Sequence, residues 1–253
     1  MPKRIRSRYW IYDLLFALVL VAATAFRFTG MNWDADQHLH PDERFLTGVT
    51  AAIESVKSVG EYFDTTNSSL NPNNRGAGFF VYGTLPLFIV RYVAEGLGQT
   101  GYGQVHLVGR ALSAVFDLGL VVLVYLIASR LFDKRVGLLA GIFSAVTVMQ
   151  IQQSHFWTVD NYANFFTLLA IYFTVRIATD KKPDSAGVGA QEKPIFNVWE
   201  FAGFGIAFGM SLASKINQPL VVLVQAAMLP AAAAIRLGML PKVVREKYYS
   251  PAF

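Results

Sequence analysis

The sequence predicts an all-α integral membrane protein with about six membrane-spanning helices and a long first extracytoplasmic loop. Hydrophobic residues make up 54% of its 253 residues, and they occur in blocks about as long as a bilayer is thick. Charged residues make up only 15%, whereas soluble domains carry about 25%, so an ordinary soluble enzyme and a disordered chain are excluded. The chain has no cysteine, which excludes a disulfide framework, thiol catalysis and Cys-ligated zinc.

Six apolar blocks are predicted to cross the membrane. The first follows a basic stretch, as a signal peptide would, but its length suits a complete span and more spans follow, so we predict an uncleaved helix. A further block, Phe79–Leu97, contains Pro86, Arg91 and Glu95 and is predicted to lie in the interface. The six spans are Tyr9–Phe28, Val105–Leu131, Val136–Ile151, Phe156–Ile177, Val198–Ser214 and Pro219–Ile235.

The distribution of Lys and Arg predicts how these spans are oriented. If Phe79–Leu97 does not cross the membrane, four basic clusters share one side and hold 15 of the 22 Lys and Arg residues. Because excess Lys and Arg mark cytoplasmic loops, both termini, the linker 178–197 and the tail 237–253 are predicted to be cytoplasmic, in a bacterial plasma membrane. The net charge of +5 therefore needs no nucleic-acid partner. The clusters are Lys3/Arg4/Arg6/Arg8, Arg130/Lys134/Arg135, Arg176/Lys181/Lys182/Lys193 and Arg236/Lys242/Arg245/Lys247.

The opposite side of the membrane receives the long segment 29–104 and two tight turns. Residues 41–59 are predicted to form an in-plane helix, because apolar residues recur along one helical face. Asp42 and Glu43 fall in its first turn, where the helix dipole favours carboxylates. Residues 82–97 are predicted to form a second in-plane helix. The whole chain is interpreted as one membrane module.

Ionisable side chains gather on this outer side. All four histidines lie there, as do several acids, and two cations lie near the outer ends of the second and fifth spans. Such groups at helix ends beside a folded loop predict a polar cavity at the outer membrane surface. The residues are His38, His40, His106, His155, Asp34, Asp36, Asp42, Glu43, Asp160, Arg110 and Lys215.

Each of these candidates has two interpretations. Asp42 could take a proton from an attacking hydroxyl, but the local sequence favours simple stabilisation of a helix start. Asp160 either begins the fourth span or belongs to the site, and Asn161 adds polarity where a structural span would be apolar. Lys215 could bind a phosphate or extend its amine to the membrane interface. Arg110 has the same two interpretations, and its guanidinium could bind phosphate oxygens through two parallel hydrogen bonds.

The run His38-Leu39-His40-Pro41-Asp42 has the residue types of a metal site. Loop histidines are more often solvated or hydrogen-bonded, so no metal site is predicted, and a divalent ion stays a minor alternative. The aromatic residues near span ends are interpreted as an interfacial belt; they are Trp10, Tyr12, Trp33, Trp157 and Trp199. Asp13 and Asp117 lie inside spans, where each is expected to pair within the bundle.

Several stretches, taken in order, carry a family resemblance. They are His40–Phe45 with its acidic pair, Tyr82–Leu87 with its proline, Val108–Ser113 with Arg110, Ser129–Ala140, and Ser154–Phe166 with Asp160. In these stretches the sequence resembles the GT-C fold of polyprenyl-phosphate-dependent glycosyltransferases. It is most similar to the branch that holds protein O-mannosyltransferases and lipid A aminoarabinose transferases.

The resemblance implies inverting transfer of a sugar from a polyprenyl phosphate to a hydroxyl acceptor, outside the cytoplasm. Asp42 would be the general base, and Asp160 would orient the acceptor or the base. Glu43, the second acid of the pair, is a further catalytic candidate. Arg110 and Lys215 would neutralise the departing phosphate. The remaining residues implied to contact substrate are His40, Asn161 and Tyr82.

Members of this family are usually longer, with further spans. The sequence therefore leaves open a fragment, a split enzyme whose second membrane chain supplies helices, or a relative that has lost activity. The alternative function is a non-catalytic GT-C-like subunit that binds membrane lipid or scaffolds a complex. A transporter is disfavoured, because the ionisable groups gather at one face and not along a path.

Overall fold

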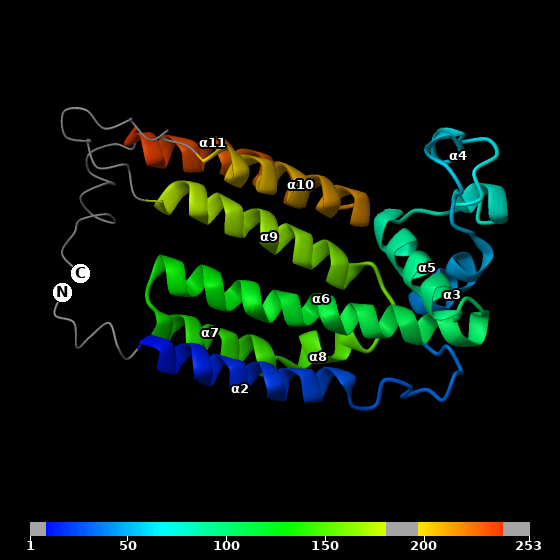
Figure 1. The fold of residues 1–253 in the computed structure, drawn as a ribbon, viewed down its shortest axis with the longest axis horizontal. Helices are drawn as coiled ribbons and strands as arrows, with labels where there is room; N and C mark the ends of the chain where they lie inside the picture. The colour runs from blue at the N-terminus through cyan, green and yellow to red at the C-terminus, as the bar shows by residue number, and fades with distance from the viewer. Residues whose placement is uncertain (1–8, 181–196, 240–253) are drawn as a thin grey trace.

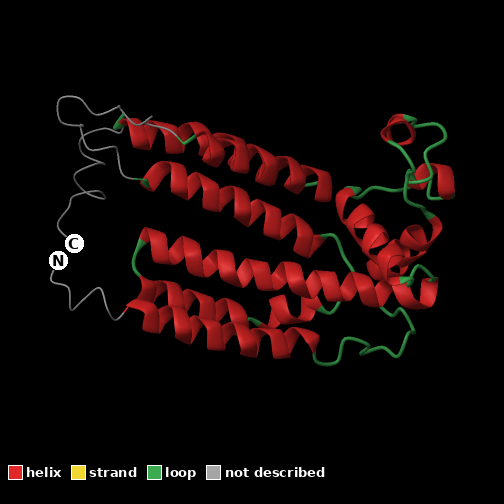
Figure 2. Cartoon of the chain, viewed as in Figure 1, coloured by secondary structure: helices red, strands yellow, loops and turns green. Residues whose placement is uncertain are grey.

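The computed structural model describes residues 9–180 and 197–239, and all regular structure within these ranges is helical (Figures 1 and 2). The predicted all-α class is confirmed for this part of the chain. The basic stretch 3–8, most of the linker 178–197 and most of the tail 237–253 lie outside the described residues. The predictions made for those segments therefore stay predictions.

Long helices run side by side along the longest dimension of the molecule (Figure 1). Helix α9 packs against α6, α10 and α11, while α6 also packs against α7 and α2. Successive long helices run in opposite directions along the bundle (Figure 1). The members of this bundle are α2 (Tyr9–Phe28), α6 (Tyr102–Leu131), α7 (Lys134–Val146), α9 (Asp160–Thr179), α10 (Val198–Ser214) and α11 (Pro219–Leu237).

Four described helices, α2, α6, α9 and α11, are long and apolar enough to cross a membrane. The predicted third span, Val136–Ile151, is not one continuous helix. It is broken at Thr147 into α7 and α8 (Val148–Ser154), which meet at a bend of 56° and make a fifth span if counted together. Helix α10 is apolar but has only 17 residues. The structure therefore supports four or five of the six predicted spans by length and composition.

At the break between α7 and α8, an arginine side chain binds carbonyl oxygens at the end of α7. Arg27, at the end of α2, donates hydrogen bonds to the carbonyl oxygens of Ala145 (3.0 Å) and Ser144 (3.3 Å). These carbonyls lie in the last turn of α7, where a helix leaves its acceptors without intrahelical partners. Because free backbone groups at membrane depth must be satisfied within the protein, Arg27 makes the break tolerable.

Shorter helices lie beyond one end of the bundle (Figure 1). They are α3 (Pro41–Ala52), α4 (Val59–Phe63), the 3-10 helix η1 (Pro72–Arg75) and α5 (Leu85–Leu97). The predicted helix 41–59 was too long: α3 ends at Ala52, and Ile53 is extended. Arg91 donates to the Thr50 and Ala51 carbonyl oxygens at 3.2 Å, so a side chain from α5 satisfies the end of α3. The predicted helix 82–97 begins three residues late, at Leu85.

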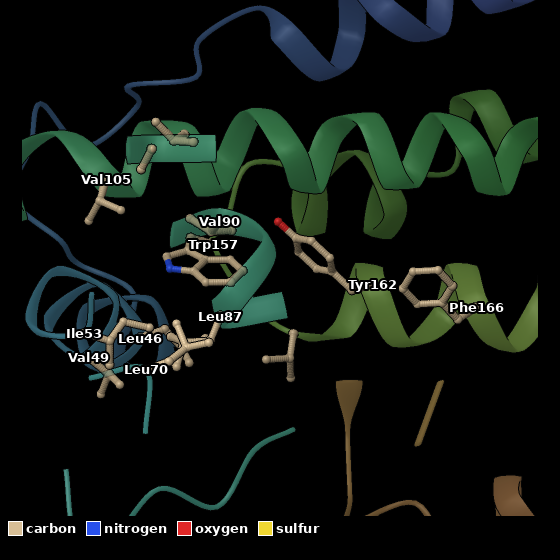
Figure 3. Close-up of a cluster of buried hydrophobic side chains, with 13 residues drawn as sticks. Leu46, Val49, Ile53, Leu70, Leu87, Val90, Val105, Trp157, Tyr162 and Phe166 are labelled. Atoms are coloured by element: carbon tan, nitrogen blue, oxygen red, sulfur yellow. The ribbon is translucent and has the colours of Figure 1, made fainter. Parts of the chain in front are cut away.

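The main core lies where this end of the bundle meets α3 and α5. Trp157 is fully buried there, with Leu87 and Val90 close to its indole ring (Figure 3). The interpretation of Trp157 as an interfacial residue was therefore wrong. Its ring packs on Gly109 of α6 so closely that a Cβ on that glycine would lie 2.4 Å from the indole. The core at this end of the bundle is therefore built from side chains of α3, α5, α6 and α9, together with Trp157.

The two acids predicted to pair inside the bundle, Asp13 and Asp117, both do so. The Arg27 guanidinium lies 2.5 Å from the Asp117 carboxylate, and both side chains are almost fully buried. Tyr125 donates to Asp13 at 2.6 Å, and Lys134 forms an ion pair with the same carboxylate. These contacts join α2 to α6 and α7.

The two ends of the bundle differ in charge. At the end where α6 and α9 finish and α7 begins, the basic residues Arg130, Lys134 and Arg176 form ion pairs with Asp180, Asp13 and Glu200, respectively. All four histidines and the candidate site residues lie toward the other end, with α3 and α5. Only five of the 15 basic residues from which the orientation was predicted lie in the described part of the chain, and all five are at this end. The orientation therefore stays a prediction.

Candidate active site

Asp42 and Glu43 are consecutive residues in the first turn of α3, yet they occupy opposite environments. Asp42 is exposed, whereas the Glu43 side chain is fully buried. His40 caps this helix, because its Nδ1 accepts the Glu43 backbone N–H at 3.3 Å. Pro41 occupies the first turn, where a proline loses no helical hydrogen bond. The helix start therefore directs one acid outward and the other into the protein.

Glu43 belongs to a buried ion-pair network centred on Arg110. The Arg110 Nε donates to Glu43 at 2.7 Å, and its two Nη atoms bind the Asp34 carboxylate at 3.0 and 2.9 Å. Arg110 also donates to the Met31 carbonyl oxygen at 2.9 Å. All three side chains have no exposed surface. Two parallel bonds to a carboxylate are the geometry for which a guanidinium is best suited.

The two acids of this network respond differently to their surroundings. Burial disfavours the charge on Asp34, but hydrogen bonds from Arg110 and from the Leu39 backbone N–H outweigh it, so the pKa of Asp34 is lowered. For Glu43 the loss of hydration dominates and raises the pKa of its carboxyl, despite bonds from Arg110 and from the Trp157 N–H at 3.3 Å. Glu43 thus connects α3 to α6 and to the segment before α9.

Asp42, Tyr82, Asp160 and Lys215 form a second, open cluster. The Lys215 Nζ lies 2.5 Å from the Asp160 carboxylate, and these side chains are 21% and 38% exposed. The Tyr82 hydroxyl interacts with the Asp42 carboxylate and lies within electrostatic range of Asp160. Partial burial, followed by these two negative charges, raises the pKa of Tyr82. Side chains from α3, the segment before α5, α9 and the end of α10 therefore meet at one place.

Gly83 explains how the Tyr82 segment reaches this cluster. A Cβ at Gly83 would lie 2.1 Å from the Ala213 carbonyl oxygen and 2.4 Å from the Ser214 carbonyl carbon. Only glycine allows two backbones to approach so closely. The segment therefore lies directly against the end of α10, whose C-cap residue is Lys215.

The structure gathers four of the eight predicted site residues in the open cluster: Asp42, Tyr82, Asp160 and Lys215. Glu43 and Arg110 lie in the buried network instead. Asn161 is buried and donates to the Ser113 carbonyl oxygen at 3.3 Å, which ties α9 to α6. His40 is occupied as the cap of α3, and its ring lies 4.3 Å from that of Phe156.

Sequence reasoning missed two contributors, Asp34 and Trp157. Asp34 was noted only as one outer acid among several, and Trp157 was assigned to the membrane interface. Neither has a local signal. Only the shared outer side of Asp34 and Arg110 could have suggested that they pair.

The weak metal candidates do not converge. The His38 ring faces Tyr102 and His106, at 4.5 and 4.4 Å between centroids, whereas His40 faces Phe156. Within the described residues, no group of three His, Asp or Glu side chains is placed to hold a metal ion. The geometry gives no support for a role of these histidines as a metal site.

The chain matches a protein family over residues 90–242, more than half of its length. The family is described as dolichyl-phosphate-mannose-protein mannosyltransferase. The chain belongs to this family. The resemblance seen in the sequence is thereby confirmed, and the match includes Arg110, Asp160 and Lys215.

A solved structure shares the fold. The S. cerevisiae protein O-mannosyltransferase Pmt1-Pmt2 complex bound to the sugar donor contains a chain that is similar to this one, with a TM-score of 0.55 and 17% identity. The similarity covers 94% of this chain and 33% of that chain, so this chain spans about a third of the length of its structural relative. No curated protein matches the sequence.

Proposed function

We propose that this chain transfers a sugar from a polyprenyl phosphate to a hydroxyl acceptor, with inversion at the sugar carbon. One observation carries the proposal. An exposed carboxylate, Asp42, lies in one open cluster with a second acid and a lysine, although these residues come from three distant parts of the chain. Family membership supports the donor class, because the family's description includes a polyprenyl-phosphate sugar.

In the proposed reaction, Asp42 accepts the proton of the acceptor hydroxyl as its oxygen attacks the sugar carbon. The new bond joins this oxygen to the sugar carbon, while the bond from that carbon to the phosphate oxygen breaks. The polyprenyl phosphate leaves with the bonding electrons, and the proton stays on Asp42. A single displacement of this kind inverts the sugar carbon, as when a carboxylate base acts opposite a leaving group.

Lys215 is the cation of the open cluster that could meet the departing phosphate. Its charge would stabilise negative charge that grows in the transition state, and Asp160 would hold its amine in position. Arg110 fits this task less well, because Nε and both Nη atoms already bind protein oxygens and no surface is exposed. We therefore assign Arg110 and Glu43 the task of positioning α3, and with it Asp42.

The proposed orientation rests on the distribution of Lys and Arg along the sequence. We propose that the basic end of the bundle faces the cytoplasm and that the open cluster faces the other side, in a bacterial plasma membrane with both termini inside. Helix α10 would then cross as a sixth span, because it connects the inner end of α9 to the outer end of α11. Helices α3 and α5, with 12 and 13 residues, are too short to span and would lie near the outer surface.

The test is a transfer assay on the protein in membranes, with radiolabelled polyprenyl-phosphate mannose as donor. Asp42→Asn should lower the rate of donor consumption by about 10²–10⁴-fold, the typical contribution of a general base, and leave folding intact because Asp42 is exposed. Glu54→Gln is the matched control, since Glu54 is an exposed acid of the same outer segment. It should keep the wild-type rate.

Full activity in Asp42→Asn would refute the assigned base. If the wild-type protein consumes no donor, either alone or with a second membrane chain that supplies helices, the alternative of a non-catalytic subunit is favoured. Among residues 9–180 and 197–239, no contact points specifically to that alternative.

A further inference from the structure

A pocket of about 190 Å³ lies in the outer segment, between α4, the loop that follows it and the start of α5. Tyr62 and Phe88 supply aromatic rings, whose centroids are 6.3 Å apart in an edge-to-face arrangement. Leu70 and Pro72 supply aliphatic surface. None of the described residues that line the pocket is charged. Its occupant is therefore expected to be neutral.

Hydroxyl groups around this pocket are free to bind. The side chains of Thr65, Ser68 and Thr84 line it, and their hydroxyls make no hydrogen bond within the described part of the chain. Thr84 precedes α5 without capping it through its side chain. Each hydroxyl can both donate and accept. Several such groups around one small hollow are complementary to a ligand that itself carries several hydroxyls.

The pocket lies next to the open cluster. Thr84 lines the pocket, and Tyr82, two residues earlier, interacts with the Asp42 carboxylate. Two residues span at most about 7 Å of chain. Gly83 between them is held against the end of α10. The pocket and the open cluster therefore share one short segment, residues 82–84.

We propose that this pocket binds one neutral hexose ring of the acceptor, so that the acceptor of the proposed transfer is a carbohydrate. Pockets for drug-sized ligands begin at about 300 Å³, so this smaller one suits a single ring. The aliphatic face of a sugar ring packs against the exposed Tyr62 ring, while its hydroxyls bond to the free threonine and serine hydroxyls. The acceptor role depends on the proposed function, whereas sugar binding itself does not.

The test is saturation-transfer NMR on the complete protein in lipid nanodiscs. The probes are the methyl pyranosides of mannose, glucose and galactose, each added separately. At least one should receive saturation, with the strongest transfer to its ring protons. Tyr62→Ala should weaken its binding about tenfold through loss of the aromatic surface, and Thr84→Val about fivefold through loss of one hydrogen bond.

Two control variants separate the possible outcomes. Phe79→Ala removes a ring that is 80% exposed and does not line the pocket, so binding should stay as in the wild type. Asp42→Asn should also bind the sugar normally, even though it should not transfer, which distinguishes failure of this inference from failure of the proposed function.

The inference is overturned if no saccharide receives saturation, which would indicate a pocket filled by water alone. It is also overturned if Tyr62→Ala and Thr84→Val, both checked for folding by circular dichroism, bind as well as the wild type. A neutral serine- and threonine-containing peptide that alone gives a Tyr62-dependent signal would assign the pocket to a protein acceptor instead.

Discussion

Asp42 and Glu43 differ by one position in the sequence, yet one belongs to an open cluster and the other to a closed one. Glu43 and Asp34 surround Arg110, and none of these three side chains has exposed surface. Asp42 is exposed and shares its surroundings with the partly exposed Lys215–Asp160 pair. A helix turns about 100° per residue, so neighbouring residues in its first turn face different directions.

This contrast separates two tasks that the sequence presents as one acidic pair. A closed ion-pair network holds elements together, but its groups have no exposed surface through which a substrate could reach them. An open cluster is solvated and contributes little to stability, but its groups are accessible. Changes in the closed network should therefore lower stability first, and changes in the open cluster should lower activity first.

The largest effect is expected from Arg110→Gln. This change leaves Asp34 and Glu43 as buried acids without their cation, and breaking a buried pair typically costs about 3–5 kcal/mol. The midpoint of thermal unfolding in detergent should fall accordingly. The matched control is Arg75→Gln, because Arg75 pairs with Glu54 at a surface where both side chains are well exposed. It should change stability by less than about 1 kcal/mol, and equal effects of the two changes would contradict the contrast.

The next effect tests the open cluster. Lys215→Gln should lower the transfer rate by about 10²–10³-fold, as does the loss of one group that stabilises transition-state charge. Its unfolding midpoint should stay close to that of the wild type, because the ion pair with Asp160 is partly exposed. Lys215→Arg keeps the charge and should retain more activity. A stability loss as large as that of Arg110→Gln would place Lys215 in a structural role.

Much of the bundle could be predicted from the sequence, because an apolar block bounded by polar residues is a local signal. The first and fifth predicted spans agree in both bounds with α2 and α10. The break at Thr147 could not be predicted, because it depends on carbonyl groups that are satisfied by Arg27, more than 100 residues away. The early end of α3 likewise depends on Arg91 from another helix.

The candidate site was predictable only in part, for the same reason. Topology alone placed Asp42, Asp160 and Lys215 on one side of the membrane, and the structure brings them together. The predicted topology could not show that Asp42 is exposed and Glu43 buried, because the burial of Glu43 depends on Arg110 and on Trp157. Pairing across tertiary contacts leaves no pattern in the local sequence.

A smaller effect concerns the pH dependence of stability. Burial raises the pKa of Glu43 above its ordinary value of 4.5, so the folded protein binds more protons than the unfolded chain above this pH. Stability contributed by Glu43 should therefore decrease as the pH rises from 4.5 through the folded pKa. Glu43→Gln does not titrate and should lose this slope, as measured by thermal unfolding between pH 4.5 and 7. Asp34, whose pKa is lowered, acts oppositely and only near or below 3.8.

The smallest effect should come from Tyr82→Phe, which removes one hydroxyl from the open cluster and keeps the ring. The hydroxyl interacts with the Asp42 carboxylate, and one hydrogen bond to a carboxylate contributes about 1 kcal/mol or slightly more. The transfer rate should therefore fall about fivefold to tenfold. KM for the donor should change little, because Tyr82 orients Asp42, and Asp42 acts on the acceptor.

Unfolding of Tyr82→Phe should match the wild type, since the ring still packs near Phe45 and Phe80. If the change raised KM for the donor and left kcat intact, Tyr82 would contact the sugar donor and would not orient Asp42. The open cluster would then divide into an acid that acts on the acceptor and a tyrosine that binds the donor.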